Sequence, residues 1–258
     1  MAGYNVSFAG AGKVGGALCR KLFSAGNRID IVASETGVRG PLLASECNAK
    51  WTGNLKFSEI TDIIIVAVPD HRLESVLSKI ECSRKTVVAH TAGSFGLNIY
   101  PAHIQRKGLF YPLQTFSQGR NINFSDLPFF LDYSDSWSGD ILSSLVRSVG
   151  GRIFEADPKK REIVHLSAVF ANNFVNHMLT SSKNIAKFGD IPFDILTPLI
   201  KETFSKALEE GPELAQTGPA VRNDYNTIEK QRDLLSFDPE LKLLYEEVTA
   251  SIIKYYKK

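Results

Sequence analysis

With 258 residues, of which 43% are hydrophobic and 22% charged, the chain has the composition of a globular protein and room for one large domain or two modest ones. Its formal net charge of +2, without a dense block of lysine and arginine before the last few residues, gives no reason to expect a nucleic-acid partner. Three widely spaced cysteines without a Cys-x-x-Cys pattern argue against a disulfide framework and a zinc site, and the lack of a signal peptide or an apolar span favours a cytoplasmic protein without a membrane partner.

The first feature in chain order is a short apolar strand, at residues 5–9, that leads into a Gly-x-Gly-x-x-Gly loop. Gly10 permits a tight turn, Gly12 allows a pyrophosphate to approach the backbone, and Gly15 lets the next helix pack closely. The free N–H groups at the start of that helix suit a dinucleotide phosphate bridge. We expect the cofactor to contact the whole loop: Gly10, Ala11, Gly12, Lys13, Val14 and Gly15.

A helix at residues 16–25 and a strand at residues 29–33 complete a mononucleotide-binding unit. The position about 20 residues past the last glycine discriminates between cofactors, because an acid there holds the ribose 2′-hydroxyl of NAD. Ser34 and Arg39 suit the 2′-phosphate of NADP, whereas Glu35 suits NAD if it turns inward. The absence of Asp at the strand tip favours NADP, with NAD as the alternative.

Residues 62–70 form the strongest strand pattern, since an unbroken β-branched run indicates burial on both faces, as in the centre of a parallel sheet. Pro69 ends this strand, so Val68, Pro69 and His71 are placed at its carboxyl end, where open α/β sheets bind ligands. His71 either lies over the cofactor or is an ordinary loop histidine at a helix start.

Another buried strand at residues 85–89 delivers a polar run to the same edge, which is either part of a binding site or only a turn, and we favour the site. In it, His90 is assigned to the cofactor and Thr91, Gly93 and Ser94 to the substrate. In the stretch 108–116, Tyr111 and Gln114 either reach the substrate or belong to a loop pinned by its aromatic residues. Further strands at 128–131 and 152–154 predict an α/β fold. We expect a doubly wound, Rossmann-type, mostly parallel sheet over residues 1–156, followed by an all-helical domain over 157–258.

The second domain is expected to open with one α-helix over residues 157–187. Its middle is apolar nearly all round, so we expect it to be buried on most sides, either between domains or between subunits. His165, Asn172 and Asn176 form one stripe on this helix, with Asn173 beside it. These amides either bind loop backbone of the first domain or line a wet pocket, and we favour the pocket. Further along, Arg222 either belongs to a helix junction or binds an anionic substrate.

Six motifs in order, GAGKVG, DIIIVAVPD, HTAGS, FYPLQTFS, HLSAVFANNFVNH and TGPAVRND, resemble a family of bacterial NADP-dependent oxidoreductases that lacks an assigned substrate. Its members pair a Rossmann-like domain with a helical C-terminal domain of unknown function, and the wider superfamily includes 6-phosphogluconate dehydrogenase and pyrroline-5-carboxylate reductase. The resemblance implies NADP at the glycine loop, a small-molecule substrate in a cleft between the domains, and a homodimer built through the helical domain.

One departure limits what the resemblance implies. The 3-hydroxyacid dehydrogenases of the superfamily carry a catalytic lysine four residues before an asparagine, and alignment of that asparagine with Asn173 places Val169 at the lysine position. His165 is the nearest candidate proton donor, with Asn172 and Asn176 beside it as catalytic residues. The sequence therefore predicts an NADP-dependent oxidoreductase that reduces a small carbonyl or imine compound, or oxidises its alcohol or amine. The alternative is a sensor or scaffold that binds NADP without turnover.

Overall fold

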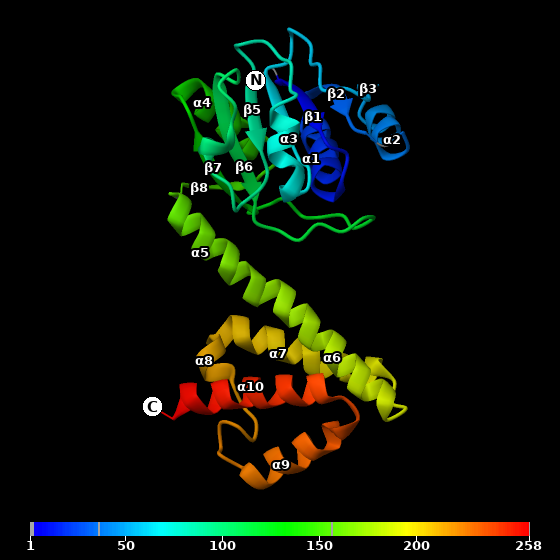
Figure 1. Cartoon of the computed structure of the whole chain (residues 1–258), viewed down its shortest axis with the longest axis vertical. Coiled ribbons are helices and arrows are strands. Elements are labelled where there is room, and N and C mark those ends of the chain that lie inside the picture. Colours follow the sequence, from blue (N-terminus) through cyan, green and yellow to red (C-terminus); the bar gives the residue numbers. More distant parts are fainter. Residues whose placement is uncertain (1–2, 36, 156, 258) are drawn as a thin grey trace. The chain divides into compact units, whose positions relative to one another are not determined.

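The computed structural model describes residues 3–35, 37–155 and 157–257, and it divides into two compact units, Met1–Asn173 and Phe174–Lys258. The first unit holds the sheet and the second is helical (Figure 1). The domain boundary predicted at residues 156 and 157 lies at the start of helix α5, within the first unit, and residue 156 itself is outside the described residues.

Among the described residues, eight strands form one sheet in the order β3-β2-β1-β4-β5-β6-β7-β8. The strands are β1 (Asn5–Ala9), β2 (Arg28–Ala33), β3 (Lys50–Thr52), β4 (Ile63–Val66), β5 (Val87–His90), β6 (Arg106–Pro112), β7 (Pro128–Tyr133) and β8 (Arg152–Glu155). All neighbouring strands are parallel except β6 and β7, which are antiparallel. The sheet is therefore doubly wound and mostly parallel, as predicted, with the β-branched strand β4 inside it.

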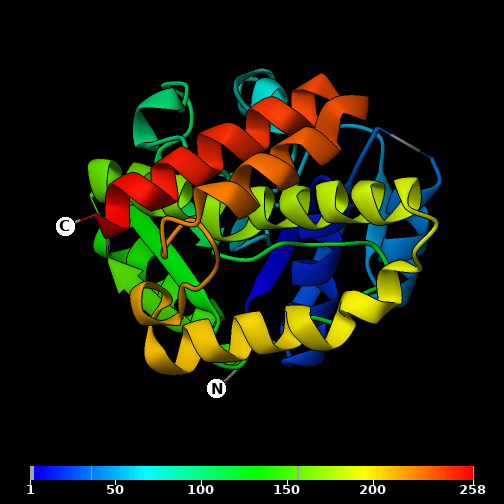
Figure 2. The ribbon, with the colours of Figure 1, turned by 90° about the horizontal axis from the view of Figure 1, so that it is seen from below.

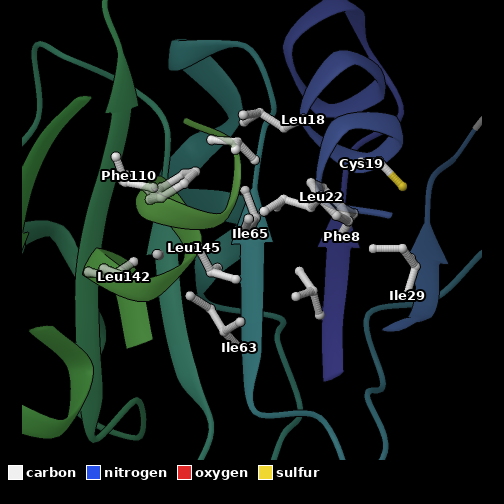
Figure 3. Close-up of a cluster of buried hydrophobic side chains, with 14 of the residues drawn as sticks. Phe8, Leu18, Cys19, Leu22, Ile29, Ile63, Ile65, Phe110, Leu142 and Leu145 are labelled. Atoms are coloured by element: carbon white, nitrogen blue, oxygen red, sulfur yellow. The ribbon is translucent and has the colours of Figure 1, made fainter. Parts of the chain in front are cut away.

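The side chains of β4 alternate between two apolar cores, one on each face of the sheet. Ile63 and Ile65 pack with α1 (Lys13–Ser24), α2 (Arg39–Glu46) and α4 (Ser136–Ser148), and Figure 3 shows Leu18, Leu22, Leu142 and Leu145 reaching this cluster. Ile64 and Val66 pack with α3 (Leu73–Leu77) on the other face. Both faces of the central strands are thus covered. This burial fixes the register of the strands, and with it the positions of the loops at their carboxyl ends.

Strand β6 shows that residues 108–116 are not all loop. The first part of that stretch is strand rather than loop, because Phe110, Tyr111 and Pro112 pair with Leu131, Phe130 and Phe129 of β7. Gln114 follows in the long connection to β7. Tyr111 is therefore held by sheet hydrogen bonding. The short edge strand β3 was not expected from the sequence.

The helix predicted over residues 157–187 begins and ends as expected but is not one regular α-helix. Asp157 caps α5 (Pro158–Ala168) by accepting from the Lys160 N–H, and α6 (Val175–Phe188) ends at Gly189. Between them, Val169–Phe174 is a π-helical turn. Because its hydrogen bonds join residues five apart, it changes the rotation per residue, and the single stripe predicted from regular helical spacing is wrong.

Large apolar side chains of this helix are exposed within the first unit, and its predicted burial between domains or between subunits stays a prediction. In the first unit, Ile163, Leu166 and Phe170 are 56%, 58% and 62% exposed. Such large apolar side chains in a row on one helix are typical of a surface that another polypeptide covers.

The second unit consists of α6, α7 (Thr197–Glu210), α8 (Pro212–Ala215), α9 (Tyr225–Leu234) and α10 (Pro239–Tyr256). The side chains of Asp224 and Asp238 cap α9 and α10. Figure 2 shows α9 and α10 side by side. In the described part of the chain, we find no helix with the length and apolar character needed to span a bilayer.

Candidate active site

The glycine loop follows β1 at the carboxyl edge of the sheet, and two of its glycines are required by the fold itself. Gly10 has a φ of +109°, and a Cβ there would lie 2.4 Å from the Ala67 carbonyl oxygen. A Cβ on Gly15 would lie 2.3 Å from the Gly10 carbonyl oxygen. Gly12 differs, because a Cβ there meets no atom within 4 Å and its φ is −73°. The space above Gly12 is thus open to a ligand.

Helix α1 begins at this loop without a capping side chain, since Gly12 is its N-cap, and its first turn carries no acid. The N–H groups of the first helical turn have no partner within the helix, so they are available to an anion together with the positive end of the helix dipole. The loop therefore fits the pyrophosphate of a dinucleotide.

The side chains at the tip of β2 are already engaged. Trp51 Nε1 donates to Ser34 Oγ at 3.2 Å, and Arg72 forms an ion pair with Glu35 that holds the pKa of this carboxyl below its usual range. Arg39 Nη2 donates to Gln118 Oε1 at 3.5 Å. Glu35, the residue that would favour NAD, thus faces Arg72.

After β4, Val68 is half-buried and Pro69 precedes a short 3-10 turn, Asp70–Arg72. His71 lies in this turn and is exposed. The placement agrees with a helix-start histidine at the ligand-binding edge, and its contact with the cofactor stays a prediction.

His90, at the end of β5, is fully buried. Its ring Nδ1 accepts from the Ala92 N–H at 3.3 Å, and its backbone N–H donates to the Tyr100 hydroxyl at 3.0 Å. Burial lowers the pKa of His90 to about 4. At neutral pH the imidazole is therefore uncharged and shapes the loop that follows it; direct contact with the cofactor stays a prediction.

The loop after β5 brings Thr91, Gly93 and Ser94 to the same edge. Thr91 Oγ1 donates to the Val66 carbonyl at 3.4 Å, and Ser94 Oγ donates to Asp70 Oδ2 at 2.9 Å. Gly93 lies against the Tyr111 ring, because a Cβ on it would be 2.7 Å from two ring carbons. Ser94 is thus a neighbour of Asp70, and Gly93 a neighbour of Tyr111.

Tyr111 and His165 form a hydrogen-bonded pair at this edge. The Tyr111 hydroxyl lies 3.1 Å from His165 Nδ1, which joins β6 to α5. Burial, and then the negative charge of Asp70, raise the pKa of Tyr111. The phenol therefore keeps its proton at neutral pH and can donate it, while the exposed His165 connects it to solvent.

Arg161, one helical turn before His165, explains why α5 lies against the sheet. Its side chain is 1% exposed, and its Nη1 donates to Asp132 Oδ2 of β7 at 2.9 Å. Its Nη2 also donates to the Phe95 carbonyl at 3.5 Å. One buried guanidinium thus ties α5 to β7 and to the Ser94 loop. Arg161 was not predicted as a site residue, because a single arginine ahead of the apolar part of a helix does not indicate a buried ion pair.

Within the described ranges, the remaining predicted site residues form no hydrogen bond with Tyr111 or His165. Asn172 and Asn173 lie in the π-helical turn and are exposed. Gln114 is exposed, and its Oε1 accepts from the Thr115 N–H at 2.8 Å. Asn176 and Arg222 belong to the second unit, where Arg222 is exposed just before the α9 cap. Among the residues that the structure describes, no group of three or more His, Cys, Asp or Glu could hold a metal ion.

Two family models match the chain. Residues 5–93 match "NADP oxidoreductase coenzyme F420-dependent", and residues 127–252 match a domain of unknown function, DUF2520. Among curated proteins, none matches the chain significantly.

Solved structures resemble the chain over nearly its full length. A protein from Bacteroides fragilis described as a "putative NADP oxidoreductase" has 33% sequence identity and a TM-score of 0.88, over 98% of this chain and 99% of that one. A protein from Thermotoga maritima has 22% identity and a TM-score of 0.81, over 98% and 100%. An imine reductase from Myxococcus stipitatus in complex with NADP+ has 14% identity and a TM-score of 0.66, over 98% and 93%.

Proposed function

Because this chain belongs to the NADP oxidoreductase family of the Bacteroides fragilis protein, we propose that it is an NADP-dependent oxidoreductase that reduces a small carbonyl or imine compound, or oxidises its alcohol or amine. The observation that carries this proposal is the 3.1 Å contact between the Tyr111 hydroxyl and His165 Nδ1 at the sheet edge that bears the glycine loop. The fold likeness to an imine reductase supports the same class of substrate by analogy.

NADP, when bound at the glycine loop, supplies or accepts the hydride. In the reductive direction the substrate carbon receives this hydride, and its oxygen or nitrogen must receive a proton. The Tyr111 hydroxyl gives that proton, and His165, bonded to the same hydroxyl, replaces it from solvent. The raised pKa keeps the Tyr111 phenol protonated at neutral pH but also makes it a weaker acid, so the proton transfer depends on the negative charge that develops on the substrate.

The groups around this pair orient the substrate. Ser94 is fixed by Asp70, and Gly93 leaves room for the Tyr111 ring, so both define where a small molecule can lie. Thr91 and Gln114 are proposed as further polar contacts, and Asn172 and Asn173 as amides of the same helix as His165. The roles predicted for Asn176 and Arg222 stay predictions.

The test follows NADPH absorbance at 340 nm with a panel of keto acids, aldehydes and imines. On an identified substrate, Tyr111→Phe and His165→Asn are expected to lower kcat roughly 10²-fold or more while NADPH still binds, because each removes a proton donor and leaves the glycine loop intact. His177→Asn, on the exposed side of α6, is the matched control and should keep wild-type turnover. Full turnover by His165→Asn would contradict the proposal.

A specific observation favours a second candidate, a protein that binds NADP without turning it over. Val169 stands where related dehydrogenases are expected to carry their catalytic lysine, and it lies in the π-helical turn. NADPH binding, together with no turnover on any compound of the panel, would support this sensor or scaffold role over the reductase.

We further infer that the helical unit pairs with a second copy of the chain. Among its described residues only Ser181, Ala186, Ala220 and Leu235 are buried, which is too small a core for an independent domain. A cavity of about 540 Å³ between α6, α9 and α10 is lined mainly by apolar side chains, such as Ile185. In a homodimer, the second copy of the chain would cover these apolar surfaces.

A further inference from the structure

Two of the three cysteines meet in the first unit, although they are 28 positions apart in the sequence. Cys19 lies on α1, and Cys47 directly follows α2. The Cys19 Sγ donates a hydrogen bond to the Cys47 Sγ at 3.5 Å, and both are free thiols. Neither cysteine takes part in the candidate active site, so the pair is available for another role.

The surroundings of the two thiols restrict them to each other. Both side chains lie in the apolar core that α1 and α2 form with the sheet, where Cys19 is 0% and Cys47 1% exposed. Figure 3 shows the Cys19 sulfur on the side of this core away from Leu142 and Leu145. Cys82, the third cysteine, packs against the core on the opposite face of the sheet. Because a side chain cannot pass through a paired sheet, Cys19 and Cys47 are the cysteines that the folded chain brings together.

The distance between the two sulfurs favours covalent bond formation. A disulfide has an S–S bond of about 2.05 Å, so the sulfurs must approach each other by roughly 1.5 Å from their hydrogen-bonded positions. Helix α2 packs against β3, a three-residue strand at the edge of the sheet. Elements at a sheet edge have fewer buried neighbours than those at its centre, so a shift of this size costs less there.

A cavity of about 650 Å³ leads to the residues that adjoin both cysteines. It lies between α1, α2 and the long connection from β6 to β7. Arg20, next to Cys19, and Glu46, next to Cys47, line this cavity and form an ion pair with an N–O distance of 2.6 Å. Because this ion pair is exposed to solvent, it opens at little cost. A small solute in the cavity can therefore approach the two thiols.

The hydrogen bond between the thiols makes them chemically unequal. Cys47 accepts this bond, which lowers the pKa of Cys47, and the positive charge of Arg20 adds to the effect. Cys19 donates the bond, which together with burial raises the pKa of Cys19. The thiolate is the reactive form of cysteine, so Cys47 is the nucleophile toward an oxidant, with the protonated Cys19 beside it.

We propose that Cys19 and Cys47 are a modification site, at which a hydroperoxide oxidises the two thiols to a disulfide that ties α1 to α2. The Cys47 thiolate attacks one peroxide oxygen, the O–O bond breaks, and Cys47 becomes a sulfenic acid while hydroxide leaves. The Cys19 sulfur then attacks the Cys47 sulfur, the S–O bond breaks, and water leaves with the Cys19 proton. With hydrogen peroxide, two thiols become one disulfide and one peroxide becomes two waters, because the hydroxide takes up the proton that Cys47 released. The reaction requires neither bound NADP nor turnover.

The test treats the reduced, purified full chain with hydrogen peroxide and maps its cysteine peptides by mass spectrometry without reduction. The native chain should give one linked pair, Cys19 with Cys47, whereas the chain unfolded in urea should also give pairs that include Cys82. Dithiothreitol should restore both thiols. Cys82→Ser is the matched control and should behave as the wild type does, because it keeps the pair. Cys47→Ala should give no link within the chain, and its Cys19 should stay reduced.

A second readout is thermal stability, because a disulfide restricts the unfolded chain between α1 and α2. The melting temperature of the Cys82→Ser chain is expected to rise by about 5 °C on oxidation and to return on reduction, while Cys47→Ala shows no rise. Oxidation of Cys82 while Cys19 and Cys47 stay free would overturn the proposal. Conversion of Cys47 to a sulfinic acid without a link to Cys19, or a link that leaves the melting temperature unchanged, would also overturn it.

Discussion

Two titratable side chains of the candidate site, His90 and Tyr111, have charge states that follow from their surroundings. His90 is uncharged because it is fully buried, and Tyr111 keeps its proton because it is half-buried near Asp70. The positive charge of Arg161 contributes to the low pKa of His90. At neutral pH the edge of the sheet therefore holds an uncharged His90 and a protonated Tyr111.

The buried His90 should make the stability of the first unit depend on pH. Its pKa is about 4 in the folded chain against 6.5 when unfolded, so the unfolded chain binds one more proton between these values. The contribution of the uncharged His90 to the free energy of unfolding is complete above pH 6.5, and about 3 kcal/mol of it is lost as the pH drops to about 4. Urea unfolding at pH 7 and pH 5 should show this fall, and it should be smaller in His90→Gln. His103→Gln is the control, and an equal pH dependence in both variants would contradict the assignment.

At the scale of elements, local patterns predicted what local forces determine. The β-branched run predicted β4. The start of the helix predicted from residue 157 is also confirmed, because the Asp157 side chain caps its own first turn. The β6 strand was less clear, since its pairing with β7 depends on residues about 20 positions away.

Other parts of the site could not be predicted because they depend on distant partners. The π-helical turn has no sequence signature, and it shifted the asparagines that regular spacing had aligned with His165. The ion pair between Arg161 and Asp132 joins residues 29 positions apart, so neither residue alone indicates a buried charge. The placement of candidate residues at the strand ends could thus be predicted, whereas the contacts that orient these residues could not.

The glycine loop allows fold and ligand binding to be separated by substitution. Gly15→Ala should destabilise the first unit by roughly 2–3 kcal/mol, because its Cβ would meet the Gly10 carbonyl oxygen at 2.3 Å. Gly12→Ala should leave stability near wild type, since no atom lies within 4 Å of the new Cβ, and should weaken NADPH binding by filling the space open to the pyrophosphate. Urea unfolding and NADPH titration measure the two effects, and normal NADPH binding by Gly12→Ala would disprove the proposed role of the loop.

At the scale of the whole molecule, the two units differ in how complete their cores are. The sheet unit buries both faces of its central strands between helices of its own chain, and its larger core includes Phe8 of β1 and Leu145 of α4. The helical unit leaves large apolar side chains in solvent, including Leu208 at 86% and Leu214 at 77% exposed. A unit with so little buried apolar area gains most of its stability from what covers it, so folding and assembly should be linked.

Val248 offers a direct test of that linkage. It lies on α10, lines the apolar cavity of the helical unit and is 42% exposed. If a second copy covers this surface, the wild-type chain should elute as a dimer in size-exclusion chromatography with light scattering, and its melting temperature should fall on dilution. Val248→Asp should then be monomeric and less stable, because a charge would be placed in the dimer interface. Ile60→Asp, at a 51% exposed position of the first unit, should remain dimeric. A wild-type monomer at concentrations of tens of micromolar, with a melting temperature independent of concentration, would show instead that the helical unit is stable without a partner.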